Sequence, residues 1–349
     1  MKLFKPNIQT SSQKTIYLHI GVPKTASSTI QKGLFDNQKA LSKIGYLYPK
    51  AGLMGTNHKN IFFELCSLPE HKPKYSISYG NSESLASEIA ATRLRNIIIS
   101  AEHFALLKSS EINSLKNIVQ PFNTKVIVYL RRQDQVIQSG WLQNTKRLVF
   151  KKSLQENIEE ELSTNKSVYH YDYLMGKWAN SFGKENMIVR IFEPEKLSGH
   201  IFEDFLKTCG IANVDQFAIP RASNISPGYK TLGLIQEIAK RIDFDHLDLP
   251  TRIEMGKQIE LFCSHLNWDH QTKYNAIDET TFNRIMSHFH LGNMKVAQDF
   301  LGVDNLFTEK FLETDLTSFS LEQVHAQEIV DLAAHLLNSL HVSTTDTQN

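Results

Sequence analysis

The chain has 349 residues and a near balance of charge, with 38 Lys and Arg against 37 Asp and Glu. This balance excludes a global basic field that would attract nucleic acid or an anionic membrane, so any anion site must be local. The three cysteines are far apart and form no CxxC pair, which argues against a disulfide framework and a zinc knuckle. We therefore expect a cytoplasmic protein with no membrane span and no nucleic-acid partner.

The N-terminal third predicts a strand, a helix and then an irregular segment. Residues 15–21 (TIYLHIG) are β-branched and aromatic and end at a glycine, which is typical of a strand. A helix is expected from about Ser28, because apolar residues recur on one face. Residues 50–95 are rich in Gly, Asn, His and Ser and predict irregular structure, with short helices near 59–66 and 83–94.

The middle of the chain alternates strands with helices. Residues 96–100 (NIIIS) and 125–130 (KVIVYL) are short continuous apolar runs, typical of buried parallel strands, and residues 187–192 (MIVRIF) predict one more. Helices are expected near 110–119, 136–142, 154–163, 171–182 and 199–209. This alternation indicates βαβ units and an α/β fold with a mainly parallel central sheet flanked by helices.

Beyond residue 221 the sequence predicts helices and no strand. Residues 321–340 carry apolar side chains at helical spacing, and residues 341–349 are expected to be a disordered tail. We therefore predict one domain over 1–349, with an α/β core at 15–220 and a helical C-terminal extension at 221–340.

The first candidate site follows the strand at 15–21 directly. Residues 21–29 (GVPKTASST) are small and polar, so the backbone can wrap closely around an anion, and Lys24 adds a full positive charge. Loop N–H groups, hydroxyls and the start of the next helix favour a phosphate there. The segment is not the nucleotide-triphosphate loop, which needs GxxxxGK[ST]. The alternative interpretation is an ordinary strand-to-helix turn with an N-cap serine.

The second candidate site lies where the strand at 125–130 ends. Arg131 follows this strand, and Ser139 lies eight positions later on the next helix. Because ligands bind at the carboxyl ends of parallel strands, the two side chains can converge on a second phosphate. The alternative is that Arg131 and Arg132 are surface arginines and that Ser139 faces solvent.

Together these two segments resemble the sulfotransferase family. Its 5′-phosphosulfate loop runs close to PKTGTT, as PKTASST does here, and its 3′-phosphate motif pairs a strand-end Arg with a Ser eight residues later, as in YLRRQDQVIQS. The resemblance implies a three-layer sandwich like that of the P-loop NTPases, and 3′-phosphoadenosine 5′-phosphosulfate as the sulfuryl donor. Arg131 and Ser139 would hold the 3′-phosphate. The 5′ side would be held by Pro23, Lys24, Thr25, Ala26, Ser27, Ser28 and Thr29.

Other segments are similar to bacterial, carbohydrate-type members of this family: VRIFEPEKL (189–197), RASNIS (221–226) and HLGNMKVAQDFLG (290–302). They imply a carbohydrate or glycolipid acceptor. The chain also departs from the pattern, since Arg132 and the following Gln replace the usual Asp-Pro. Ala26 replaces the usual Gly, which predicts that a conformation with φ > 0 is not required there.

The catalytic candidates are Lys24, Glu102 and His103. In this family a lysine at the position of Lys24 stabilises the charge that grows on the leaving group. The acceptor hydroxyl benefits from a general base, and Glu102 and His103 follow the strand at 96–100. We favour Glu102 as the base, with His103 second. The alternatives are an acid that faces a helix dipole and a half-buried imidazole.

Three other histidines carry weaker signals. His58 could line the acceptor side, but a histidine on a surface loop is the simpler interpretation. His288 and His290 have an HxH spacing, but no carboxylate or thiolate partner can be identified with them. We read that pair as ordinary helix residues and predict no metal.

The function hypothesis is therefore sulfuryl transfer from 3′-phosphoadenosine 5′-phosphosulfate to a hydroxyl of a small-molecule or glycan acceptor. One alternative is a nucleotide-dependent kinase on a related fold, which needs the triphosphate loop and a strand-end Asp for magnesium. The other is a non-catalytic nucleotide-binding module. The sequence names neither the acceptor nor the oligomeric state.

Overall fold

Five parallel strands form the sheet of the computed structural model, in the order β2-β3-β1-β4-β5. The structure describes residues 14–220, 227–266, 268, 276–308, 310–311 and 319–345. The strands are β1 (Thr15–His19), β2 (Tyr46–Leu47), β3 (Asn96–Ser100), β4 (Asn123–Leu130) and β5 (Met187–Ile191). The predicted parallel sheet is confirmed, and β2 is the strand that the sequence did not predict. The RASNIS segment (221–226) lies outside the described residues.

The chain divides into two compact units. The first comprises Met1–Arg132, Lys166–Ala222 and Phe289–Glu309, and it contains the sheet. The second comprises Gln133–Asn165, Ser223–His288 and Lys310–Asn349. In the described ranges, no helix has both the length and the apolar character required to cross a lipid bilayer.

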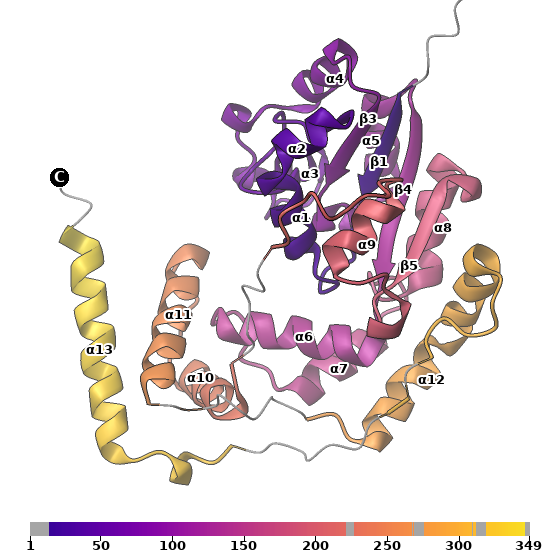
Figure 1. Ribbon diagram of the computed structural model, residues 1–349. Helices are drawn as coiled ribbons and strands as arrows, with labels where there is room; N and C mark the ends of the chain where they lie inside the picture. The colour runs from indigo at the N-terminus through magenta and orange to yellow at the C-terminus, as the bar shows by residue number, and fades with distance from the viewer. Residues whose placement is uncertain are drawn as a thin grey trace, which may run out of the picture. The chain divides into compact units, whose positions relative to one another are not determined.

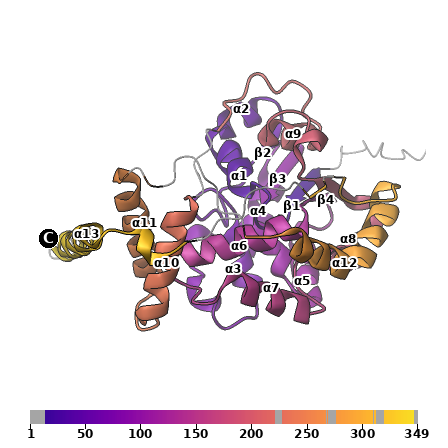
Figure 2. The same cartoon turned by 90° about the horizontal axis from the view of Figure 1, so that it is seen from below.

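Helices cover both faces of the sheet, and β1 is therefore buried on both sides. Its residues Ile16 and Leu18 belong to one apolar cluster, whereas Tyr17 packs against the other. Figures 1 and 2 show α1, α2 and α9 on one face of the sheet, with α5 on the other. The helices that face the second cluster are α1 (Ser27–Asp36), α2 (Gln38–Lys43) and α9 (Ile201–Thr208).

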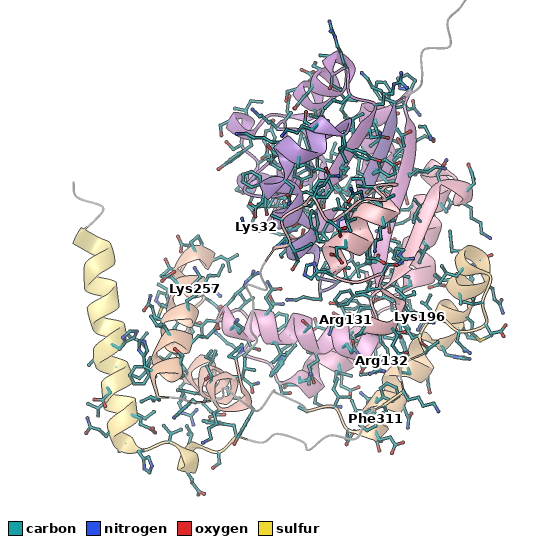
Figure 3. All side chains as sticks on the ribbon, viewed as in Figure 1. Lys32, Arg131, Arg132, Lys196, Lys257 and Phe311 are labelled. Carbon is teal, nitrogen blue, oxygen red and sulfur yellow. The ribbon has the colours of Figure 1, made fainter. Side chains whose placement is uncertain are left out.

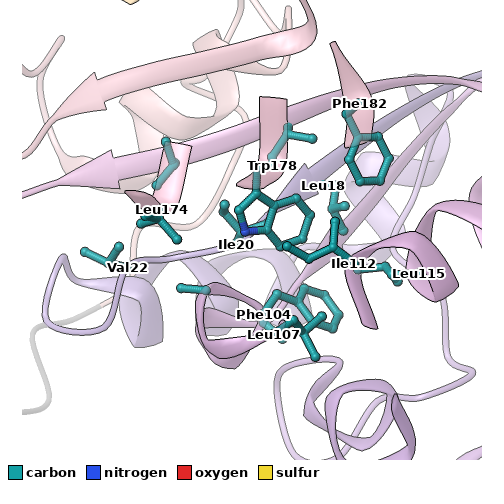
Figure 4. Packing of buried hydrophobic residues seen from close by; sticks show 14 of the residues in the cluster. Leu18, Ile20, Val22, Phe104, Leu107, Ile112, Leu115, Leu174, Trp178 and Phe182 are labelled. Atoms are coloured by element: carbon teal, nitrogen blue, oxygen red, sulfur yellow. The ribbon is translucent and has the colours of Figure 1, made fainter. Parts of the chain in front are cut away.

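The larger apolar cluster lies beneath the opposite face. It is contributed by α3 (Lys59–Leu65), α4 (Ser82–Ala91), α5 (Ser109–Val119) and α8 (Tyr171–Phe182). Trp178 is fully buried there, and Figure 4 shows it among Leu18, Ile20 and Phe104. A buried indole removes a large apolar area from water, so this packing is a main source of the unit's stability.

The second unit is helical, and its core contains Leu234, Ile235, Ile259, Cys263 and Leu332. Its helices are α6 (Gln133–Lys146), α7 (Leu154–Ser163), α10 (Tyr229–Arg241), α11 (Leu249–His265) and α13 (Ala326–Thr345), while α12 (Glu279–Val296) contributes to both units. Within the described residues no strand follows β5, as predicted. The last helix continues to Thr345, past the predicted end at residue 340, and residues 346–349 lie outside the described part.

Short turns of tighter or wider helix complete the description. The 3₁₀ turns are η1 (Lys72–Lys74), η2 (Ile77–Tyr79), η3 (Glu102–Leu106), η4 (Lys184–Asn186), η5 (Pro194–Lys196) and η7 (Leu321–Gln323). A π-helical turn, η6 (Ala297–Leu301), continues α12. The turn η3 matters most here, because it follows β3 at the sheet edge where the site is built.

A buried carboxylate ties α9 to the sheet. Asp204 accepts hydrogen bonds from the Tyr129 hydroxyl at 2.6 Å, from Nε of Arg190 at 3.2 Å and from the backbone N–H of Ser198 at 2.9 Å. Burial alone would raise the pKa of Asp204, but the hydrogen bonds from Arg190, Tyr129 and Ser198 hold it below its ordinary value of 3.8. This carboxylate therefore stabilises the fold in its ionised form.

We expect Asp204→Asn to lower the free energy of unfolding by about 2 kcal/mol at pH 7, because Arg190 then lacks its charged partner. The folded pKa is lowered, so the contribution is present above 3.8 and is lost as the pH falls below that value. Urea unfolding at pH 7 and pH 3 would therefore show the difference from wild type shrinking at low pH. As a control, Asp36→Asn removes an i,i+4 partner of Lys32 near the surface and should cost under about 0.5 kcal/mol.

Candidate functional site

The strand order brings three chain segments to one edge of the sheet. β1 lies between β3 and β4, with His19 opposite both Ser100 and Ile127. The pairing with β4 continues beyond β1, because the N–H of Val22 donates to the carbonyl of Tyr129 at 3.0 Å. The loop after β1, the turn η3 after β3 and the arginines after β4 therefore start side by side, as the sequence predicted from the carboxyl ends of parallel strands.

The loop after β1 has the backbone of an anion cradle. Lys24 has φ 71° and Ala26 has φ 57°, one on each side of Thr25. Such alternation turns successive N–H groups toward one point, which is the geometry called a nest. The Thr25 hydroxyl donates to the Val22 carbonyl at 2.6 Å, and the Ser27 hydroxyl donates to the same carbonyl at 3.3 Å. These two hydroxyls thus hold the loop in shape.

The prediction that Ala26 needs no positive φ was wrong. Ala26 is the N-cap of α1 and adopts the left-handed conformation. The conformation is imposed from both sides, since Val22 is still paired to β4 and the carbonyl of Ala26 already accepts from the N–H groups of Thr29 and Ile30. An L-residue with a Cβ pays about 1–2 kcal/mol there, which glycine would not.

The start of α1 is not capped by a side chain. The helix begins at Ser27 and has ten residues, and its N-cap residue Ala26 makes no capping side-chain hydrogen bond. The N-cap is therefore Ala26 and not a serine as in the alternative interpretation, while anion binding by the loop stays a prediction. Uncapped N–H groups and the helix dipole favour a bound anion. Ser28 is exposed and Thr29 is half-buried at this end.

Arg131 lies against this loop. Its Nη1 donates to the carbonyl of Lys24 at 3.0 Å, and its guanidinium lies 5.5 Å from the ring centroid of Phe192. The Tyr171 hydroxyl donates to the Arg131 carbonyl at 2.5 Å and holds the backbone at that point. Figure 3 marks Arg131 and Arg132, and Arg132 is buried. The alternative of two surface arginines is therefore wrong.

Ser139 is placed on α6, in the second unit. Its part in a 3′-phosphate site stays a prediction. The structure thus brings together the loop residues and Arg131, which all belong to the first unit.

Glu102 is the first residue of η3 and lies directly beside the loop. A Cβ added to Gly21, which has φ 102°, would come within 3.0 Å of both Cα and the carbonyl oxygen of Glu102. Only glycine permits this close approach of the two segments. The Glu102 carboxylate accepts from Nε2 of Gln31 at 2.6 Å, and Gln31 accepts from Nδ2 of Asn57 at 3.1 Å. The predicted base candidate and the predicted phosphate loop are therefore neighbours.

Gln31 and Asn57 were not predicted. The available signal was the position of Gln31 on the buried face of α1, which it shares with Ile30 and Leu34. A polar side chain on an apolar helix face needs a buried partner. Asn57 gave no such signal, because it lies in the irregular segment whose structure depends on contacts distant in sequence.

His103 lies beside Glu102 and packs on aromatic rings. Its Nδ1 is 3.8 Å from Oε1 of Glu102, and its ring centroid is 5.4 Å from that of Phe62 and 6.0 Å from that of Phe63. Burial lowers the pKa of His103 below 6.5, Glu102 opposes this shift, and nearby positive side chains add to it. The neutral imidazole is therefore favoured at pH 7. The positive groups are Lys59, His71 and Lys74.

The interpretation of His58 as a surface-loop residue was wrong, because the side chain is fully buried. The backbone N–H of Ser100 donates to its Nδ1 at 3.2 Å, so Nε2 carries the proton and donates to the carbonyl of Pro49 at 3.0 Å. His19 is also fully buried, with its Nδ1 2.7 Å from the Ser100 hydroxyl. Burial lowers the pKa of each histidine to about 4.

No arrangement that would hold a metal ion, with three or more His, Cys, Asp or Glu side chains, occurs among the described residues. His288 and His290 lie exposed on α12. The expectation that no metal is used remains a prediction.

Comparison with known proteins leaves the family open. No family model matches the chain. A protein of Archaeoglobus fulgidus described as uncharacterized is 29% identical over 245 residues, which are 68% of this chain, and the chain spans 62% of the length of that relative. A solved structure of a sulfotransferase from Alicyclobacillus acidocaldarius is 15% identical and matches 65% of this chain and 96% of its own, with a TM-score of 0.40. At that TM-score the assignment of the site rests on this chain's own geometry.

The left-handed conformation of Ala26 predicts opposite effects of two substitutions on the free energy of unfolding. We expect Ala26→Gly to raise the free energy of unfolding by up to about 1 kcal/mol, because it removes the Cβ strain. Ala26→Val should lower it by about 1–2 kcal/mol, since a β-branched residue tolerates this region poorly. In the helical control Ala86→Gly on α4, the sign should reverse. Urea unfolding measures all three, and a destabilising Ala26→Gly would contradict the assigned conformation.

The buried histidines predict a pH dependence of stability. The folded pKa of His19 and of His58 is about 4 and the ordinary value is 6.5, so the unfolded chain binds more protons between these values. The free energy of unfolding should therefore rise between pH 4 and pH 6.5, by up to about 3 kcal/mol for each histidine. Above pH 6.5 this contribution is complete and no longer changes with pH. NMR titration of the imidazoles checks this directly. Titration of either ring near pH 6.5 would show that it is not buried as described.

Proposed function

We propose that this protein transfers the sulfuryl group of 3′-phosphoadenosine 5′-phosphosulfate to an acceptor hydroxyl. The observation that carries the proposal is the hydrogen bond between the Arg131 guanidinium and the Lys24 carbonyl. It joins the two segments whose motifs suggested two separate phosphate contacts. An arginine next to a nest of N–H groups suits a ligand with two phosphates on one ribose.

On this proposal the loop and the start of α1 hold the 5′ side of the donor through backbone N–H groups and the hydroxyls of Ser28 and Thr29. Thr25 and Ser27 contribute by shaping the loop, because both hydroxyls are used on Val22. Lys24 adds the charge that stabilises the leaving phosphate. Arg131 and Ser139 take the 3′-phosphate. When bound, the donor supplies an activated sulfuryl group whose leaving group is a stable bisphosphate.

We assign the general base to Glu102, with His103 orienting the acceptor hydroxyl. The backbone of Glu102 lies against the loop at Gly21, and its carboxylate accepts from Gln31 on α1, the helix that follows the loop. We therefore place the carboxylate near the reactive end of the donor. His103 is packed on Phe62 and Phe63 and is favoured in its neutral form, in which it can donate or accept one hydrogen bond. A carbohydrate acceptor is proposed from the bacterial-type segments alone.

Neither alternative function is favoured by the site. A kinase of the P-loop type would need an acid at the end of β4 to bind magnesium, whereas β4 ends at Leu130 and is followed by Arg131 and Arg132. A non-catalytic binding module would not require a carboxylate beside the phosphate cradle. The three cysteines are buried, and a cytoplasmic location is proposed from their number and spacing in the sequence.

The test is thermal unfolding with adenosine 3′,5′-bisphosphate. A ligand that binds only the folded state, at about 100 times its dissociation constant, adds roughly 2.7 kcal/mol to the free energy of unfolding. We expect this increment for wild type with the bisphosphate, and not with ADP or with ATP and magnesium. Arg131→Ala should abolish the increment, and Arg131→Lys should keep only part of it, because lysine retains the charge without the planar fork.

The matched control is Arg93→Ala, which removes an exposed arginine just after α4 and should leave the increment unchanged. Comparing increments rather than melting temperatures separates ligand binding from any loss of stability in the variants. Stabilisation by ATP and magnesium alone would favour the kinase. No stabilisation by any of the nucleotides would overturn the donor site.

A further inference from the structure

A directed chain of hydrogen bonds links the backbone of α3 to the Glu102 carboxylate. The backbone N–H of Lys59 donates to Oδ1 of Asn57 at 3.0 Å, and Nδ2 of Asn57 donates to Oε1 of Gln31 at 3.1 Å. Nε2 of Gln31 then donates to Oε2 of Glu102 at 2.6 Å. Three short contacts in series thus connect a fixed backbone group to the proposed base.

The direction of this chain is set at both ends. A backbone N–H can only donate, and an ionised carboxylate can only accept. The amides of Asn57 and Gln31 therefore have one orientation each that satisfies every contact. Both side chains are buried, so a flipped amide would leave polar atoms unsatisfied at a cost of about 1–3 kcal/mol. The arrangement fixes Oε2 of Glu102, while Oε1 lies on the side of His103.

The chain also couples the carboxylate to the phosphate loop. Gln31 lies on α1, which begins where the loop ends, and Lys59 is the first residue of α3. Glu102 begins η3 and contacts Gly21 in the loop. Movement of the carboxylate relative to the loop would therefore break contacts to two helices.

We propose that Gln31 and Asn57 are positioning residues that hold the Glu102 carboxylate in one orientation beside the phosphate loop. Neither residue is assigned a contact with donor or acceptor, and both act through Glu102. The proposal rests on the proposed function only in naming Glu102 as the base, because the hydrogen bonds themselves belong to the structure.

The test uses the pKa of His103 as a sensor of where the carboxylate lies, measured by NMR on the full chain with labelled histidine. Glu102 raises this pKa, whereas burial and the charges of Lys59, His71 and Lys74 lower it. In Gln31→Met, which preserves side-chain length without the amide, Glu102 loses its donor. We expect the freed carboxylate to pair with His103 and raise the pKa of that histidine by about one unit.

Two further variants separate positioning from general loss of structure. Asn57→Ser breaks the chain one step earlier and should give a smaller rise in the pKa of His103. In a Glu102→Gln background, Gln31→Met should produce no rise, because the sensing charge is gone. The control is Asn37→Ser at the other end of α1, whose amide donates to the carbonyls of Gly33 and Ala218, and which should leave His103 unchanged.

An unchanged pKa of His103 in Gln31→Met, or an equal rise in Asn37→Ser, would overturn the proposal. Bisphosphate stabilisation is measured on the same samples and should be retained in Gln31→Met, because Gln31 holds no part of the donor. If wild type showed no bisphosphate stabilisation while His103 responded as expected, the proposed function would fall and the positioning role would stand.

Discussion

The structure depends on a single constraint, which is that β1 is hydrogen-bonded on both sides. With β3 on one edge and β4 on the other, β1 cannot shift its register without breaking two ladders. The pairing to β4 runs on to Val22, so the loop begins from a fixed backbone position. The strained conformations of Lys24 and Ala26 follow from this, since the chain must pass from an anchored strand into α1 within a few residues.

Two buried polar side chains of the irregular segment at 50–95 are held by the backbone. His58 is fixed by a carbonyl on one ring nitrogen and an N–H on the other, and Asn57 is fixed by the N–H that begins α3. Breaking such a contact is unfavourable, because a buried polar atom without a partner has lost its hydrogen bonds to water without replacing them. These contacts fix the positions of side chains in the segment at 50–95, although much of that segment has no regular structure. A flexible-looking sequence can therefore support one wall of a site.

The local parts of the structure were predictable, and the parts that depend on distant contacts were not. The strand at 96–100 and the helices at 154–163 and 171–182 have the predicted bounds, because continuous apolar runs and helical periodicity are local signals. The two-residue β2 was missed because pairing with β3 defines it, and nothing in its own sequence does. In the site, the loop and Arg131 were predictable from their positions after strands. Gln31, Asn57 and the burial of His58 were not, since each needs a partner from another element.

Ala26 shows why substitution patterns mislead about backbone conformation. Ala26 stands where the sulfotransferase loop pattern has glycine, which suggested that a positive φ was not needed there. The positive φ is nevertheless dictated by the anchored strand before Ala26 and the helix after it. The side chain only changes what that conformation costs. An energy of about 1–2 kcal/mol is small beside the packing that holds β1 and α1 in place, so the fold tolerates the strain.

The origin of the positive charge in the proposed site explains why a count of charged residues did not reveal it. The chain carries a formal net charge of only +1, and on the proposed function the donor is attracted by oriented N–H groups together with Lys24 and Arg131. Backbone dipoles do not appear in a count of charged residues. Glu102 lies against the loop and receives a hydrogen bond from Gln31. If Glu102 is the base and the loop binds the donor, as we propose, the bound anion repels this carboxylate. A neutral donor such as Gln31 can then restrain it without itself being drawn to the anion, as a lysine or arginine would be.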